Sequence, residues 1–545
     1  MDFTDIELSG KTRREHDLLG EMDIPVEYYF GVQTMRAVEN FHISRVRLNF
    51  FPQLIRALAD VKQGAAAANR DLGLLDPAIA DAITRACEEL REGRLNEQFV
   101  VDMVQGGAGT STNMNANEVI ANRALELLGH EKGEYAYCHP NNHVNLSQST
   151  NDAYPTAVRI ALARSIDGAV ASLRELIAAF HAKGEEFALI IKMGRTQLQD
   201  AVPMTLGQEF EAYAATLTEE IDRLQTNLRL FYEINMGATA IGTGINADPD
   251  YAELCTKHLR EITGLPLSKA TNMIEATSDT GAATLTEEID RLQTNLRLFY
   301  EINMGATAIG TGINADPDYA ELCTKHLREI TGLPLSKATN MIEATSDTGA
   351  FIMNSSALKR LAVKLSKICN DLRLLSSGPR CGLNEINLPP RQPGSSIMPG
   401  KVNPVIPEVV NQVAFRVIGN DLTITLASEA GQLELNVMEP IIVHSLFENI
   451  EMLVNAMNTL REKCVVGITA NPEVCRRMVY NSIGLVTALN PYLGYETSTM
   501  LAKEALQTGK GIYDLVLEHR LMSEEELHKV LLPENMVHPR KKITE

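Results

Sequence analysis

The sequence lacks the basic surplus, the long apolar runs and the paired cysteines that several classes of protein require. Its 545 residues carry 70 acidic and 50 basic side chains, a formal net charge of −20. Nucleic acids and anionic membranes are bound by basic surfaces, so neither is expected as a partner. No apolar run is long enough to span a bilayer. Residues 1–21 are charged and lack an apolar core, so no secretory signal is expected.

The eight cysteines are scattered, with no CxxC pair and no metal-ligand spacing. This usage is typical of reduced thiols in a cytoplasmic protein. His139 and His143 are close in sequence, but no further donors stand at a ligand spacing. The sequence therefore predicts no metal site and a cytoplasmic location.

An internal repeat changes the effective length of the chain. Residues 214–281 recur without one mismatch as residues 282–349, an offset of 68. Solenoid repeats diverge and occur three or more times, whereas this repeat is perfect and occurs twice. It is either a very recent tandem duplication or a feature absent from the natural protein. A 68-residue window is expected to be extruded from a fold built for one copy, because loop closure costs only logarithmically more as loops lengthen.

Apolar residues at steps of three and four predict long helices with bundle seams. Helices are expected over residues 51–69 and 77–92, and from a first-turn Pro155 through Phe180. The seams lie at positions 210, 214, 217, 221, 224, 228 and 231, at 358, 361, 365, 368, 372 and 375, and at 442, 446, 450, 453, 457 and 460. Helices with such seams are typical of a bundle, which we expect to be shared between subunits.

We therefore predict a mainly all-α protein of three domains around a central long-helix bundle. The N-terminal, mainly helical domain covers residues 1–148. The central bundle covers residues 149–470 and contains both copies of the repeat. Asn471 and Pro472 open a region of shorter helices, so residues 471–545 form a small C-terminal helical domain.

Polar segments interrupt the helical pattern and could surround a small anion. Residues 106–117 read GGAGTSTNMNAN before a helix expected from Glu118, and residues 139–152 place hydroxyls and amides at the head of the next long helix. Free N–H groups at a helix N-terminus make a plausible carboxylate cradle, although a Gly-rich turn with an Asn cap is the simpler reading of residues 106–117 taken alone. Residues 192–208 offer further polar groups ahead of another long helix.

Residues 394–404 read GSSIMPGKVNP. Gly and Pro make this a shaped loop that can turn Ser395, Ser396, Lys401 and Asn403 towards one anion, although an ordinary polar connection between helices remains the alternative for a Ser-Ser pair alone. The loop is similar to the signature loop of the aspartase/class II fumarase superfamily, whose members eliminate a group from a succinyl skeleton to leave fumarate.

Distant segments resemble aspartases rather than fumarases. They read QSTNDAYP at 148–155, KMGRTQLQD at 192–200, ATSD at 276–279, NEINLP at 384–389 and EAGQLELNVMEP at 429–440. The resemblance covers essentially the whole chain apart from the extra copy. Removing 68 of the 545 residues leaves 477, the usual size of a subunit in the family.

The resemblance implies the reversible deamination of L-aspartate to fumarate and ammonia by a homotetramer. No cofactor is required, although a divalent cation such as Mg²⁺ could act as an activator. Fumarate hydratase, or a related fumarate-forming lyase, is the alternative within enzymes. A non-catalytic relative disabled by the duplication is the alternative of another class.

The resemblance also implies roles for individual residues. Abstraction of the β-proton passes through an aci-carboxylate, so preorganised donors must surround that carboxylate. The implied β-carboxylate cradle consists of Thr110, Ser149, Thr150 and Ser396. Lys401 and Asn403 would hold the other carboxylate, while Asn151, Thr196 and Gln197 would face the amino group. Ser395 resembles the general base, its alkoxide stabilised by loop N–H groups and by Lys401. Many relatives carry a histidine where this chain has Gln197, so no histidine base is expected there.

Overall fold

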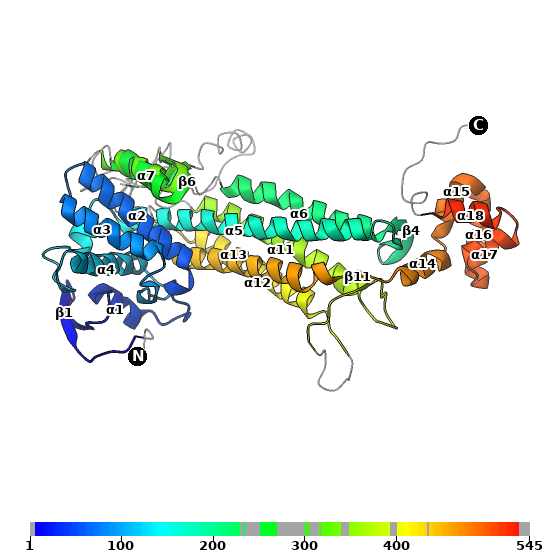
Figure 1. The fold of residues 1–545 in the computed structure, drawn as a ribbon, viewed down its shortest axis with the longest axis horizontal. Coiled ribbons are helices and arrows are strands. Elements are labelled where there is room, and N and C mark those ends of the chain that lie inside the picture. Colours follow the sequence, from blue (N-terminus) through cyan, green and yellow to red (C-terminus); the bar gives the residue numbers. More distant parts are fainter. Residues whose placement is uncertain are drawn as a thin grey trace. The chain divides into compact units, whose positions relative to one another are not determined.

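The computed structural model describes residues 6–228, 233–234, 251–269, 300–302, 304, 316, 318–338, 348–392, 401–432 and 435–532. Helices dominate this part of the chain, as predicted, and strands are few and short (Figure 1). The chain forms two compact units. One comprises Met1–Ala169, Arg223–Lys359 and Val417–Glu451, and the other comprises Val170–Asp222, Arg360–Arg416 and Met452–Glu545. The division into three domains stays a prediction.

The N-terminal part of the first unit is a short hairpin followed by helices. Strands β1 (Thr12–Asp17) and β2 (Gly20–Pro25) pair antiparallel. The helices that follow are α1 (Val32–Asn40), η1 (Leu48–Phe50), α2 (Pro52–Asp71), α3 (Pro77–Arg91), η2 (Asn96–Gln98), α4 (Thr110–Leu127) and the π-helical turn η3 (Pro140–Val144). Helices α2 and α3 confirm the predictions for residues 51–69 and 77–92. Asp76 caps α3 by accepting a hydrogen bond from the N–H of Ala78.

Helix α4 begins at Thr110, so the expected start at Glu118 was wrong by two turns. Gly107 and Gly109 adopt φ of 91° and 85°, and these left-handed residues turn the chain into the helix. The side chain of Gln105 accepts a hydrogen bond from the N–H of Thr112 and so satisfies one of the first free donors. The second half of the predicted polar loop is therefore the first part of a helix.

The long helices carry the predicted seams. They are α5 (Thr150–Glu186), α6 (Leu206–Leu228), α11 (Gly349–Leu375), α12 (Val405–Glu429) and α13 (Glu439–Lys463). Every predicted seam position of α11 and α13 is buried, as are positions 210–224 of the α6 seam. The side chain at position 228 and the whole of position 231 lie outside the described residues. Pro155 is the sixth residue of α5 rather than a first-turn residue, because this helix begins earlier than expected, directly after Ser149.

In the second unit, parts of these helices pack on one another and on a small C-terminal helical region. Phe180 contacts Phe210 and Tyr213 edge-on or tilted, and Arg360 pairs with the buried Glu220 at 3.1 Å. The remaining elements are β3 (Ile191–Thr196), β4 (Gln199–Thr205), β10 (Ile386–Asn387), η5 (Val465–Gly467), β11 (Thr469–Ala470), α14 (Pro472–Asn481), α15 (Leu485–Leu493), α16 (Tyr495–Thr508), α17 (Ile512–Glu518) and α18 (Glu524–Val530). Ile191 and Met193 of β3 join the apolar core of this C-terminal region.

One helix from each copy of the repeat occupies the same place in the first unit. Helix α7 (Tyr251–Thr263) belongs to the first copy and α10 (Tyr319–Thr331) to the second, and both contact α2. The equivalent residues Cys255 and Cys323 coincide. Two helices cannot fill one volume together, so we infer that this position fits either copy.

Short strands accompany both copies. They are β5 (Glu233–Ile234) and β6 (Gly264–Lys269) in the first copy, and β7 (Tyr300–Ile302) and β8 (Gly332–Lys337) in the second. Across all the helices that the structure describes, none has the length and apolar character needed to cross a membrane.

Candidate functional site

The N-termini of α4 and α5 lie side by side in the first unit. Thr110 is the first residue of α4, is exposed, and donates its hydroxyl to the carbonyl of Gly107 at 2.7 Å. The preceding Gly109 packs against the Tyr154 ring of α5 so closely that a Cβ there would lie 2.5 Å from a ring carbon. Only glycine permits this approach, which brings the two helix starts together.

Ser149 and Asp152 form a reciprocal cap at the start of α5. The Ser149 hydroxyl accepts from the N–H of Asn151 at 3.3 Å, and the Asp152 carboxylate accepts from the N–H of Ser149 at 2.8 Å. The Ser149 oxygen is used as an acceptor, and its own hydrogen can still be donated outward. Ser149, Thr150 and Asn151 are all half-buried.

Asn113 connects the starts of α4 and α5, a role that was not predicted. Its amide donates to the Thr150 hydroxyl oxygen at 3.2 Å from one turn beyond Thr110. The fold thus brings together predicted site residues from two separate segments: Thr110, Ser149, Thr150 and Asn151. Two adjacent helix N-termini with hydroxyl donors can bind a carboxylate.

A buried polar network supports this site from below. The side-chain Oδ1 atom of Asn145 accepts hydrogen bonds from Lys62, Asn113 and Asn117 at 2.9, 3.1 and 3.0 Å. Lys62 also donates to Gln148, the residue before Ser149, at 2.9 Å. Burial lowers the pKa of Lys62 to about 7, against an opposing effect of the nearby Asp152 carboxylate. Burial likewise holds the pKa of Asp152 well above its usual range.

The network was missed because the polar run of residues 106–117 was expected to be a loop. Asn113 and Asn117 are four residues apart, so they share a face once the helix begins at Thr110. That spacing was the available signal. His139 and His143 have a structural use here, since the Nδ1 atom of each accepts backbone N–H groups of the 139–142 turn.

Thr196 and Gln197 lie in the second unit, at the tip of the β3–β4 hairpin. Both are exposed, and Gln197 and Leu198 adopt φ of 54° and 62°. Two consecutive left-handed residues are the geometry of a tight type I′ hairpin turn. The structure thus presents these two side chains on a strand-borne turn and not on a segment leading directly into a helix.

Lys401 and Asn403 lie in the second unit just ahead of α12. Lys401 is exposed and Asn403 is half-buried. The carbonyl of Asn403 accepts from the N–H of Val405, the first residue of the helix, at 2.9 Å. Ser395 and Ser396 lie outside the described residues, so their predicted roles stay predictions.

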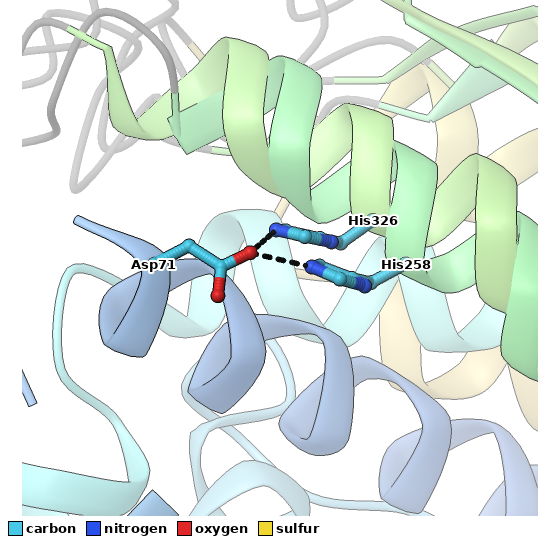
Figure 2. Close-up of side chains that lie close together, drawn as sticks. All are labelled: Asp71, His258 and His326. Atoms are coloured by element: carbon cyan, nitrogen blue, oxygen red, sulfur yellow. Dashed lines mark hydrogen bonds and ion pairs between the residues drawn. The ribbon is translucent and has the colours of Figure 1, made fainter. Parts of the chain in front are cut away.

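A group of two histidines and a carboxylate stands apart from these segments. Asp71 lies against His258 and His326, and their nitrogen and oxygen atoms come within 4.8 Å of one another (Figure 2). His258 and His326 are equivalent residues of the two copies and overlap at the one position that the copies share. Both rings lie at ion-pair distance from Asp71, His258 Nε2 at 3.0 Å and His326 Nε2 at 2.7 Å from its Oδ2.

Comparison with known proteins identifies the family. The family described as Lyase matches residues 20–286 and 281–419, and the family described as Fumarase C C-terminus matches residues 485–538. The chain belongs to this lyase family. The match to it restarts at residues 281–286, where the second copy of the repeat begins, so each copy is read as a segment of the same family domain.

Relatives of this lyase share almost its whole length. The aspartate ammonia-lyase of Pseudomonas aeruginosa is 56% identical and covers 97% of this chain and 98% of its own. That of Helicobacter pylori is 51% identical, over 97% of this chain and 98% of its own. The aspartate ammonia-lyase of Escherichia coli is 49% identical, over 98% of this chain and 97% of its own.

Solved structures show the same fold. A fumarate lyase:delta crystallin from Brucella melitensis bound to cobalt is 50% identical, with a TM-score of 0.82 over 97% of this chain and 100% of that chain. A class II fumarase from Schistosoma mansoni is 33% identical, with a TM-score of 0.77 over 97% of this chain and 100% of that one. The lyase is therefore more similar in sequence to the aspartate ammonia-lyases above than to this fumarase.

Proposed function

We propose that this lyase catalyses the reversible deamination of L-aspartate to fumarate and ammonia. The observation that carries the proposal is the pairing of the α4 and α5 N-termini, with Thr110 and Ser149–Asn151 gathered at one place by Asn113. Full-length identity of 49–56% to aspartate ammonia-lyases supports the same activity.

In the proposed mechanism, the β-carboxylate of L-aspartate is bound where the two helices start. The α-carbon bears the amino group, and the proton leaves from the neighbouring carbon, next to the β-carboxylate. That carboxylate must take up a second negative charge, and fixed donors stabilise this aci-carboxylate more than they stabilise the substrate. Thr110, Ser149 and Thr150 supply hydroxyls for this purpose, together with Ser396.

The remaining predicted residues complete the proposed site. Ser395 removes the β-proton as an alkoxide stabilised by loop N–H groups and by the cationic Lys401. Lys401 and Asn403 bind the other carboxylate. Asn151, Thr196 and Gln197 face the amino group, which leaves as ammonia.

We further propose a homotetramer that assembles through the long helices. Helix α12 exposes large apolar side chains along one stripe: Phe415 is 63% exposed, Leu422 is 60% and Leu426 is 59%. Steps of seven and four place all three on one face of the helix. An exposed apolar stripe of this kind is a typical subunit interface. Size-exclusion chromatography with light scattering tests the assembly, and a monomer would contradict it.

The proposal includes no resident cofactor, because hydroxyl, amide and lysine groups supply the donors that the chemistry needs. A divalent cation such as Mg²⁺ would act only as an activator, so chelation should lower the rate without abolishing it. We also assign the protein to the cytoplasm. The exposed Cys381 is a free thiol, which suits a reducing compartment.

The activity is tested by following fumarate formation in ultraviolet light with L-aspartate and then with L-malate. We expect fumarate from L-aspartate and not from L-malate. Fumarate from L-malate alone would identify a fumarate hydratase. No product from either substrate would favour a relative disabled by the duplication.

A further inference from the structure

The base of the β3–β4 hairpin is held by one buried carboxylate. Glu385 is fully buried, and its two oxygens meet Lys192 Nζ at 3.0 Å and Arg195 Nη1 at 2.8 Å. Lys192 also pairs with Glu209 of α6. The cluster contains two cations and two carboxylates, so its charges balance.

A β-bulge makes this double contact geometrically possible. Residues 192 and 195 are an odd number apart, so a regular strand would point their side chains to opposite faces. The register of β3 against β4 shifts between Met193 and Arg195, and such a bulge re-aims the side chains that follow it. Gly194 sits at the bulge, where a Cβ would lie 2.8 Å from the carbonyl oxygen of Val202. The bulge therefore turns both cations towards Glu385.

The anchored residue lies directly beside the hairpin tip. Arg195 precedes Thr196 and Gln197, the residues proposed to face the amino group. The other side of the tip is also tied, because the Ser482 hydroxyl donates to the Asp200 carboxylate at 2.7 Å. Gln197 and Leu198 adopt left-handed φ values that disfavour non-glycine residues. Such a conformation persists when the surroundings fix it, and here the two anchors do so.

Glu385 is itself held rigidly by its backbone. Its N–H donates to the carbonyl of Leu375, and its carbonyl accepts from the N–H of Asn471, both at 2.9 Å. It also precedes, in the same connection, the segment that carries Lys401 and Asn403. One residue thus anchors the hairpin and belongs to the stretch of chain leading to the second group of proposed site residues.

We propose that Glu385 is a positioning residue that aims Thr196 and Gln197 at the amino group of the substrate. It acts through Arg195 and does not touch the substrate. Removing one partner of a buried ion pair leaves an uncompensated charge, so Glu385 and Arg195 each depend on the other staying in place. The inference rests on the proposed function, because the direction in which the tip points matters only if an amino group is bound there.

The test compares ligands that differ in the amino group. Steady-state kinetics give KM for L-aspartate, and inhibition gives Ki for succinate, a dicarboxylate without the amino group. In Glu385→Gln we expect KM for L-aspartate to rise about tenfold, the effect of losing one well-placed hydrogen bond to a charged group, while Ki for succinate stays within about twofold. In the reverse direction KM for ammonium should rise and KM for fumarate should not. Glu385→Asp, which restores the charge, should recover part of the effect.

Asp60→Asn is the matched control. Asp60 is a fully buried carboxylate of the first unit that pairs with Arg91 at 3.0 Å and with Arg164 at 2.6 Å. The Asp60→Asn substitution should lower thermal stability without changing the ratio of KM for L-aspartate to Ki for succinate. If the Glu385→Gln variant does not fold, Arg195→Ala tests the same role. In that variant Lys192 still neutralises the Glu385 carboxylate.

Each outcome bears on a different claim. An unchanged ratio in Glu385→Gln, or in Arg195→Ala, would overturn the positioning role while the wild-type activity stands. Equal losses for both ligands would also overturn it, since they indicate a purely structural role. A wild-type enzyme that makes no fumarate from L-aspartate would instead overturn the proposed function.

Discussion

Lys62 Nζ donates a 2.9 Å hydrogen bond to the side-chain Oδ1 atom of Asn145, the same oxygen to which Asn113 and Asn117 donate from α4. This oxygen therefore accepts from α2 and from α4. Lys62 reaches on to Gln148, directly ahead of the Ser149 cap. The residues beneath the proposed carboxylate site are thus held by the buried, ionisable amine of Lys62.

Lys62→Met should change how stability depends on pH. Burial lowers the pKa of Lys62 to about 7 in the folded state, against 10.5 ordinarily, so the folded state binds fewer protons between these values. Stability then rises with pH across that window, by an amount on the order of 4 kcal/mol. The variant should lack this rise, as measured by denaturant unfolding at pH 7 to 10. A difference between the two proteins that does not vary with pH would contradict the assignment.

Asn113→Ala should impair catalysis by releasing Thr150. We expect kcat/KM for L-aspartate to fall about tenfold, because a hydroxyl aimed at the developing charge loses its partner. Asn115→Ala is the control on the same helix. Asn115 is equally buried but binds the backbone of Val100 and Gln98 away from the helix start, so its loss should lower stability and leave kcat/KM nearly unchanged. Equal kinetic losses in the two variants would refute the positioning of Thr150 by Asn113.

Glu118→Gln should stabilise the protein towards neutral pH. Burial, together with the nearby Glu15 carboxylate, raises the pKa of Glu118 to about 7, so the folded state binds more protons than the unfolded state between about pH 4.5 and 7. Stability therefore falls as pH rises through this window, by something on the order of 3 kcal/mol. Glutamine cannot ionise, so the free energy of unfolding of the variant should not show this fall with pH. Unfolding measurements from pH 5 to 8 test this.

Glu89→Gln provides the contrast. The Arg123 guanidinium lowers the pKa of Glu89, so that carboxylate is already ionised across the same range. The free energy of unfolding of the Glu89→Gln variant should therefore differ from that of the wild type by the same amount at every pH between 5 and 8. A Glu118 variant that likewise shows only a constant offset would contradict the raised pKa.

The shared position of the repeat predicts an unusual mutational pattern. Leu259 and Leu327 are equivalent residues of the two copies and both are buried. Leu259→Ala alone, or Leu327→Ala alone, should leave stability almost unchanged, because the intact copy fills the position. The double variant should lose about 2–5 kcal/mol, the usual cost of Leu→Ala in a core. The urea midpoints of unfolding of the two single variants and of the double variant test this pattern.

Leu58→Ala, in the unrepeated helix α2, serves as the reference. Leu58 is fully buried and has no second copy, so its single replacement should carry the full cost. If either repeat variant alone were as damaging as the double, the position would belong to that copy only.

The long helices were predictable from sequence, but the contacts that build the site were not. The seams of α11 and α13 rest on apolar spacing, which depends only on the helical period. The start of α4 was missed because asparagine is unfavourable in helix interiors unless its amide finds partners. Asn113, Asn115 and Asn117 find theirs in residues distant in sequence, which local rules do not see.

The β3–β4 hairpin was not predicted from the sequence, for a related reason. Its turn uses Gln197 and Leu198 in place of the Asn-Gly pair that marks such turns. The anchors that hold the turn are Glu385 and Ser482, far along the chain. The roles of Lys401 and Asn403 stay predictions from the resemblance, as do those of Ser395 and Ser396.

We expect the chain to work as an aspartate ammonia-lyase with its repeat in place. The most direct test is the rate of fumarate formation from L-aspartate by the full 545-residue protein, with its intact mass of 59.9 kDa confirmed, beside a variant lacking residues 282–349. Because the position fits either copy, we predict comparable kcat for the two proteins. An inactive full-length protein beside an active shortened one would contradict the account.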